Sequence, residues 1–140
     1  MPLIRHFRNL RVYRASFQAA MRIFELSKSW PREERYSLTD QARRSSRSAC
    51  GCIAEAWRKR RYPKHFVSKL TDSDSEAGET QAWLDFALHC GYLGQEDFDD
   101  LDQRYEEISG GLASMMGDAD RWCDPSTAVR EDEPPYRVET

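Results

Sequence analysis

Basic side chains crowd one part of the chain at a spacing that suits phosphate recognition. The candidate set has eight members: Arg43, Arg44, Arg47, Arg58, Lys59, Arg60, Arg61 and Lys64. The arginines at positions 43, 47, 58 and 61 fall near one line of a helix, so their guanidinium groups could neutralise neighbouring phosphates and release counterions. These residues are candidates for binding nucleic acid, with little sequence preference because no base-reading motif accompanies them.

The same arginines could instead be solvated and paired with nearby carboxylates. Three acids lie on helices that should pack together: Glu55, Glu76 and Glu79. With Arg43 and Arg44 they could form an inter-helix ion-pair network, which would support structural specificity more than stability. We interpret these residues first as such a network and second as part of a ligand surface.

The sequence lacks the residue spacing that metal sites in helical bundles require. A di-metal site needs a Glu three residues before a His, and Tyr62 and Phe86 occupy those positions before His65 and His89. The two thiols of the sequence Cys50-Gly51-Cys52 would point about 200° apart on a helix, so they could not share one ion. We interpret these cysteines as small buried hydrophobic residues.

The acidic run at 72–76 resembles a calcium loop only superficially. Gly78 comes one position too late, and Trp83 stands where a bidentate Glu is required. The sequence also lacks a glycine-rich phosphate cradle, and it places no Ser or Cys beside a base. We therefore expect no metal, no cofactor and no enzymatic activity.

Composition limits the class of protein further. The 140 residues suffice for one domain, with 39% hydrophobic and 32% charged residues. No apolar run approaches the roughly 20 residues of a membrane span, and the first six residues lack the apolar core of a signal peptide. Four cysteines are too few and too irregularly spaced for a disulfide scaffold. We expect a cytoplasmic protein with no membrane partner.

Charge is sorted along the chain. Residues 1–65 hold sixteen basic and five acidic residues, a net charge of +11, whereas residues 66–140 hold five basic and nineteen acidic residues, a net charge of −14. Such asymmetry can direct a basic face at an acidic partner such as nucleic acid. It can equally attract the two halves to each other, within one bundle or between subunits.

Apolar residues recur every three or four positions in four stretches, which predicts helices over 8–29, 38–61, 63–90 and 96–122. Ser37 is the expected cap of the second helix, Pro63 suits the first turn of the third, and Gly91 should end it. Short connections favour antiparallel neighbours. We predict an all-α, antiparallel up-down-up-down four-helix bundle over residues 1–122 and a flexible acidic tail over 123–140.

Two of these helices have distinctive faces. The first carries two apolar lines, more than packing in an isolated small bundle requires, and this predicts a subunit contact. One line is Leu10, Tyr13, Phe17, Met21 and Phe24, and the other is Val12, Ala15, Ala19, Ile23 and Leu26. The inner line of the second helix is made of mostly small residues that would allow close approach: Leu38, Ala42, Ser45 or Ser46, Ala49, Ile53 and Trp57.

Several short segments together resemble one known family. They are FRNLRVY at 7–13, YSLTDQARR at 36–44, IAE at 53–55, EAGETQAWL at 76–84 and GYL at 91–93. In this order and spacing the chain resembles, over roughly residues 7–122, the four-helix bundle proteins of the 23S rRNA-intervening-sequence type. The family commonly has a Pro-Ser-Asn-like stretch before Ile-Ala-Glu-Gly. This chain has Cys50-Gly51-Cys52 there, so a role tied to that Asn is not carried over.

The resemblance implies a non-enzymatic homo-oligomer, with a pentamer as the expected form. Family members are similar in fold to the accessory protein of diversity-generating retroelements, a barrel-like pentamer with a basic surface that works with nucleic acid and a reverse transcriptase. The expected partners are therefore further copies of the chain and RNA, or an RNA-binding protein complex. The alternative is a protein-interaction or assembly module without affinity for nucleic acid.

Overall fold

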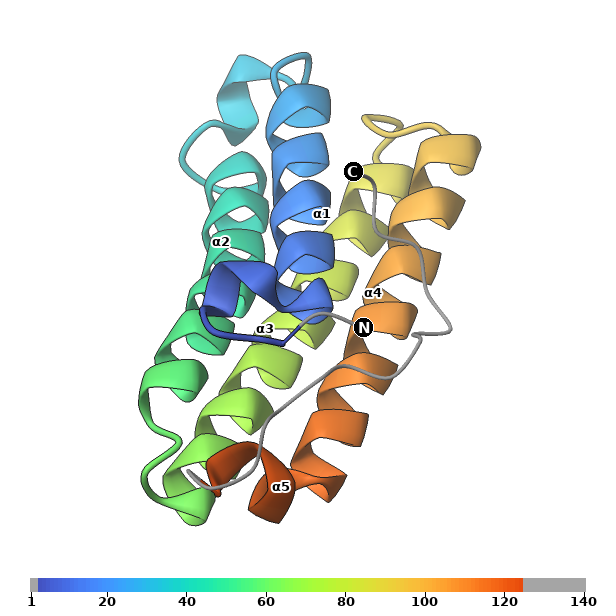
Figure 1. Cartoon of the computed structure of the whole chain (residues 1–140). Coiled ribbons are helices and arrows are strands. Elements are labelled where there is room, and N and C mark those ends of the chain that lie inside the picture. The colour runs from blue at the N-terminus through green and yellow to red at the C-terminus, as the bar shows by residue number, and fades with distance from the viewer. Residues whose placement is uncertain (1–2, 125–140) are drawn as a thin grey trace.

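The computed structural model describes residues 3–124, and these form an all-α bundle of four long antiparallel helices (Figure 1). The long helices are α1 (Arg11–Ser27), α2 (Leu38–Arg58), α3 (Pro63–His89) and α4 (Gln95–Gly117). Three short helices accompany them: η1 (Phe7–Asn9), η2 (Arg32–Glu34) and α5 (Ala119–Cys123). The predicted up-down-up-down topology is confirmed. The tail expected over 123–140 lies outside the described residues, apart from its first two positions.

Three of the predicted helices are longer than the observed ones. The helix expected over 8–29 is divided at Leu10, whose extended backbone (φ −67°, ψ 131°) separates η1 from α1. The helix expected over 96–122 is divided at Asp118, directly after Gly117, so that α5 is a separate turn. The second helix ends at Arg58 rather than at Arg61, and a turn leads into Pro63.

Ser37 is the residue that precedes α2, as predicted, but its hydroxyl does not cap the helix. The Ser37 hydroxyl donates a 2.6 Å hydrogen bond to Glu34 Oε1, and its backbone (φ −126°, ψ −102°) departs from the extended form of a capping residue. Glu34 serves the helix start instead, since its Oε1 lies 3.4 Å from the Leu38 N–H. At the end of α3, Gly91 has a φ of +79°, a left-handed conformation that glycine adopts without a Cβ penalty, which confirms the predicted stop.

The centre of the bundle is the contact between α2 and α3, where small residues allow close approach. Ser73 Oγ donates a 2.6 Å hydrogen bond to the Ala49 carbonyl, and the hydroxyls of Thr80 and Ser45 share a 2.8 Å hydrogen bond. All four side chains are buried. These bonds satisfy polar groups that would otherwise destabilise the core. The predicted inner line of α2 is confirmed, with only Leu38 half-buried at its start.

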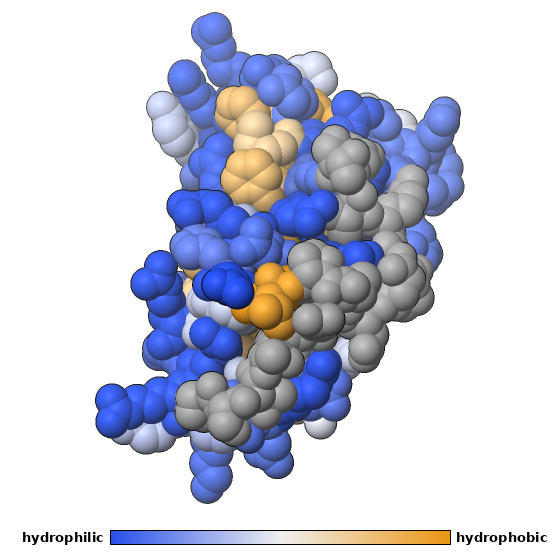
Figure 2. All heavy atoms as spheres, viewed as in Figure 1, coloured by the Kyte–Doolittle hydropathy of each residue, from blue (hydrophilic) through white to orange (hydrophobic). Residues whose placement is uncertain are grey.

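The two apolar lines of α1 have different surroundings. Val12, Ala15, Ala19 and Ile23 lie in the core. On the other line, Phe17 is 50% exposed and Met21 is 45% exposed. The face seen in Figure 2 is largely hydrophilic, with a small hydrophobic patch over α1.

The four cysteines are free thiols. Cys50 and Cys52 are both buried on α2, as expected for small hydrophobic residues, and burial raises the pKa of the Cys50 thiol to about 11. Cys90 is exposed after the end of α3.

Candidate nucleic-acid interface

The length of α2 separates the eight predicted basic residues into two groups. Arg43, Arg44 and Arg47 lie in its first half, and the other five lie at its end and in the turn to α3. Because a helix rises about 1.5 Å per residue, the two ends of α2 are roughly 30 Å apart. One small ligand could not contact both groups.

The second group forms the surface that we call the basic end: Arg58, Lys59, Arg60, Arg61 and Lys64, together with Arg5 and His6. Arg5, His6, Arg58, Arg60 and Arg61 line a hollow of about 380 Å³ whose remaining wall is Trp57. Sequence analysis missed Arg5 and His6, because only the folded chain brings the N-terminal segment against the end of α2. The only feature of the sequence that could have pointed to Arg5 and His6 is that both residues are basic.

Within the basic end, Arg60 has a structural role. Its Nε donates a 3.0 Å hydrogen bond to the Trp57 carbonyl, and its guanidinium lies 3.4 Å from the centroid of the Trp57 ring. Trp57 in turn packs edge-on against Trp122, with ring centroids 6.3 Å apart. Burial lowers the pKa of Arg60 from its ordinary value, and the group remains cationic at neutral pH. The tryptophan pair therefore joins α5 to the end of α2, and Arg60 packs against the Trp57 ring of that pair.

The other cations of this turn differ from Arg60 in their surroundings. Arg58, Lys59, Arg61 and Lys64 are exposed, and none of them forms an ion pair with a residue in the part of the chain that the structure describes. Arg58 and Arg61 rest near aromatic rings, 5.9 Å from Phe7 and 5.7 Å from Tyr62. Aromatic rings next to cations can stack bases while the cations contact phosphates.

The first group of arginines is engaged with the protein itself. Arg43 Nε donates a 2.8 Å hydrogen bond to Ser27 Oγ, and its terminal nitrogen lies 3.4 Å from the Phe24 carbonyl. Both Arg43 and Arg47 also lie over the Phe24 ring, at 4.9 and 5.7 Å from its centroid. Arg44 bonds to Gln41 one turn earlier. The contacts of Arg43 and Arg47 join α2 to the end of α1, whereas the Arg44 bond lies within α2.

The three acids of the expected ion-pair network have different partners. Glu55 pairs at 3.0 Å with Lys69, which joins α2 to α3 and also lies 3.6 Å from Asp72. No ion pair joins Arg43 or Arg44 to an acid within residues 3–124.

Glu76 and Glu79 lie beside each other on α3. The pKa of Glu76 is raised by burial and then by the charge of Glu79, and the positive charge of Arg44 opposes this shift only in part.

Among residues 3–124, no group of three or more His, Cys, Asp or Glu side chains could hold a metal ion. None of the helices in that range is long and apolar enough to cross a bilayer.

The fold and this surface define an all-α helical bundle with a basic end. Residues 8–114, more than half of the chain, match the family model of the 23S rRNA-intervening sequence protein. The chain belongs to this family.

A solved structure is similar along most of the chain. It is a protein of unknown function from the S23 ribosomal protein family of Bacteroides thetaiotaomicron, with 28% sequence identity and a TM-score of 0.68. The similarity covers 75% of this chain and 97% of that one. The comparison with curated proteins finds no match.

Proposed function

We propose that the protein is a non-enzymatic, homo-oligomeric bundle that binds nucleic acid through its basic end. The observation that carries this proposal is the group of four exposed cations, Arg58, Lys59, Arg61 and Lys64, with no carboxylate paired to them within residues 3–124. Phosphates would supply the missing negative charge. The name of the family refers to an intervening sequence of 23S rRNA, which makes RNA the first nucleic acid to test.

This interface has a defined electrostatic signature. Each phosphate neutralised on a single strand contributes about −0.7 to the slope of log K against log salt concentration. Four cations therefore predict a slope of roughly −3. The surface carries no motif that reads bases, so affinity should vary little between sequences of equal length.

The test is RNA binding by fluorescence anisotropy at low salt, with a 5′-hydroxyl oligonucleotide. The variant Arg58→Glu/Arg61→Glu should weaken binding at least tenfold and leave helicity unchanged, because both side chains are exposed. Arg32→Glu/Arg35→Glu is the matched control, since it makes the same change in charge at the opposite end of α2 and should bind normally. Equal loss in both variants, or no loss in either, would refute the assignment to the basic end.

Assembly is supported by a different observation. Phe17 and Met21 are about half exposed and lie one turn apart on α1. An apolar pair of this kind suits a contact between subunits. We propose that α1 contributes to a homo-oligomer, for which the family resemblance suggests a pentamer.

The same apolar face favours the alternative function, an assembly module that binds protein and has no affinity for nucleic acid. The two proposals differ in the anisotropy measurement above. An assembly module would retain no RNA at low salt even as the unmodified protein.

A further inference from the structure

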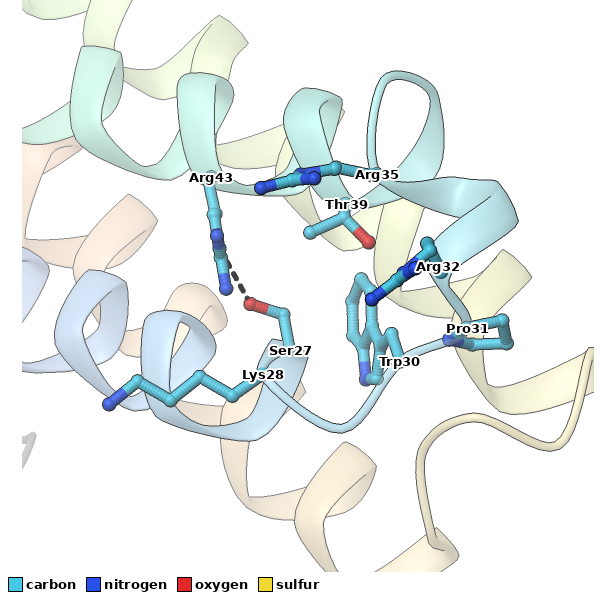
Figure 3. Close-up of a pocket in the computed structure, with 8 residues that line it drawn as sticks. All are labelled: Ser27, Lys28, Trp30, Pro31, Arg32, Arg35, Thr39 and Arg43. Atoms are coloured by element: carbon cyan, nitrogen blue, oxygen red, sulfur yellow. Dashed lines mark hydrogen bonds between the residues drawn. The ribbon is translucent and has the colours of Figure 1, made fainter.

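A second basic hollow lies at the opposite end of α2, between the end of α1 and the start of α2 (Figure 3). Its volume is about 380 Å³. Four of the residues that line it are cationic, and they come from three different parts of the chain: Lys28, Arg32, Arg35 and Arg43. The uncharged part of the wall is Ser27, Trp30, Pro31 and Thr39. We call this site the cationic hollow.

The four cations differ in how far they are already neutralised. Arg43 is held in place by Ser27 and the Phe24 carbonyl, which are neutral partners. Lys28 shares its charge with Glu25 at 3.1 Å. Arg32 and Arg35 are exposed, and their side chains form no hydrogen bond or ion pair with a described residue. At least three positive charges therefore remain for a ligand.

The nearest acids do not cancel this charge. Glu34 does not line the hollow, and its carboxylate is occupied by the hydroxyls of Ser37 at 2.6 Å and Tyr92 at 2.9 Å. These hydrogen bonds lower the pKa of Glu34, so it stays ionised in its own site. Glu33 and Asp40 also lie outside the lining.

Polar donors complete the site. Thr39 is only 6% exposed, its side chain makes no hydrogen bond with a described residue, and its hydroxyl points into the space near Arg32 and Arg35 (Figure 3). Thr39 belongs to the first turn of α2, so its hydroxyl adds a neutral donor beside the four cations.

The charge of the site selects the ligand. An internal phosphodiester carries a single negative charge, which one or two of these cations would neutralise, whereas a terminal di- or triphosphate carries about two to four. We propose that the cationic hollow binds a terminal di- or triphosphate group. The group could belong to a free nucleotide or to the 5′ end of an RNA, and the volume lies in the range of small-molecule sites. This inference does not depend on RNA binding at the basic end.

The first test is calorimetric titration of the full-length protein with inorganic pyrophosphate at fixed ionic strength. Pyrophosphate should bind, and sulfate should bind at least tenfold more weakly. In Arg32→Gln/Arg35→Gln the affinity for pyrophosphate should fall at least tenfold. The matched control Arg58→Gln/Arg61→Gln removes the same charge from the basic end and should bind pyrophosphate as the unmodified protein does.

Three results would overturn the proposal. The first is no binding of pyrophosphate. The second is equal affinity for pyrophosphate and sulfate, which would indicate an adventitious ion only. The third is equal weakening of pyrophosphate binding in both double variants, which would indicate an effect of net charge. Circular dichroism of each variant verifies that the helices are intact.

The second test separates the two sources of the phosphate group. One arm compares 5′-triphosphate RNA with 5′-hydroxyl RNA of the same sequence, and the other titrates ATP. A preference for the triphosphate end that disappears in Arg32→Gln/Arg35→Gln assigns the site to RNA ends. ATP binding that disappears in the same variant assigns it to nucleotides. If neither arm depends on these arginines, the proposal fails, even where 5′-hydroxyl RNA still binds at the basic end.

Discussion

Arg60 and Arg61 are neighbours in sequence, but they lie in different environments. The guanidinium of Arg60 is stacked on Trp57 and hydrogen-bonded to its carbonyl, whereas Arg61 is exposed and unpaired within the described residues. A stacked cation and a hydrogen bond each contribute about 1 kcal/mol. We expect Arg60→Ala to lower the free energy of unfolding in urea by about 1–2 kcal/mol. Arg61→Ala, the control, should change it by less than about 0.5 kcal/mol; equal effects would contradict the structural role of Arg60.

The thiols should differ sharply in reactivity. Thiolate is the reactive form, and burial raises the pKa of Cys50 to about 11, while Cys90 is exposed. With Ellman's reagent at pH 8, Cys90 should react at least tenfold faster than Cys50. The variant Cys90→Ser should remove the fast phase without affecting the slow one. If the fast phase survived this substitution and was lost in Cys50→Ser, the reagent would have access to the Cys50 thiol, and the burial of this residue on α2 would be contradicted.

Glu76 should make stability depend on pH. Its pKa is higher in the folded protein than the ordinary value of 4.5, because burial and the charge of Glu79 disfavour the carboxylate. The folded state therefore binds the proton more tightly, and stability is lost as pH rises through 4.5 and the higher folded value. Glu76→Gln should raise the free energy of unfolding, measured in urea at pH 7, by less than about 1 kcal/mol, and give no gain at pH 3. An equal gain at both pH values would exclude this ionisation as the cause.

At the scale of the elements, the contact between α2 and α3 leaves no room for larger side chains. Ala49 is fully buried where its carbonyl accepts the Ser73 hydroxyl. Ala49→Leu should overpack this contact and lower the free energy of unfolding by about 1–3 kcal/mol. Ala82→Leu makes the same substitution at an exposed position of α3 and should change it by less than about 0.5 kcal/mol. Urea titrations of both variants measure the difference, and similar values would contradict close packing at Ala49.

Helical spacing alone was enough to predict the four long helices and the buried line of α2, because a 3.6-residue repeat places those side chains on one face. The helix ends were less predictable. The division at Leu10 depends on the extended backbone of a residue that is neither glycine nor proline. At the start of α2, the Leu38 N–H is capped by the carboxylate of Glu34. This carboxylate is held in place by a hydrogen bond from Tyr92, which lies 58 positions away in the sequence.

The candidate site was also predicted only in part, because contacts between residues far apart in sequence place several of its side chains. Spacing placed Arg43 and Arg47 on one helical line, but their attachment to Phe24 depends on how α1 packs beside α2. Arg5 and His6 join the basic end through the fold of the N-terminal segment. The cationic hollow collects residues from α1, η2 and α2, and no sequence motif marks it.

At the scale of the whole molecule, charge and apolar surface are separated. The basic end and the cationic hollow lie at opposite ends of α2, and α4 opens with acids of which Asp97 pairs with Arg22 of α1 at 3.0 Å. That ion pair is a direct contact between the basic and acidic halves of the chain. The exposed side chains of Phe17 and Met21 lie on α1, and neither of them lines the hollow of the basic end or the cationic hollow. One molecule could therefore assemble through α1 and still present its basic end.

The most direct test of this account is size-exclusion chromatography of the full-length protein with light scattering and absorbance at 260 and 280 nm. We predict a closed oligomer, with a mass of about 82 kDa for five copies of the 16.4 kDa chain, and co-eluting nucleic acid that high salt removes. Phe17→Ser/Met21→Ser should lower the mass, and Phe86→Ser, at another exposed apolar side chain, should not. A mass of one chain with no nucleic-acid absorbance, even at low salt, would contradict it.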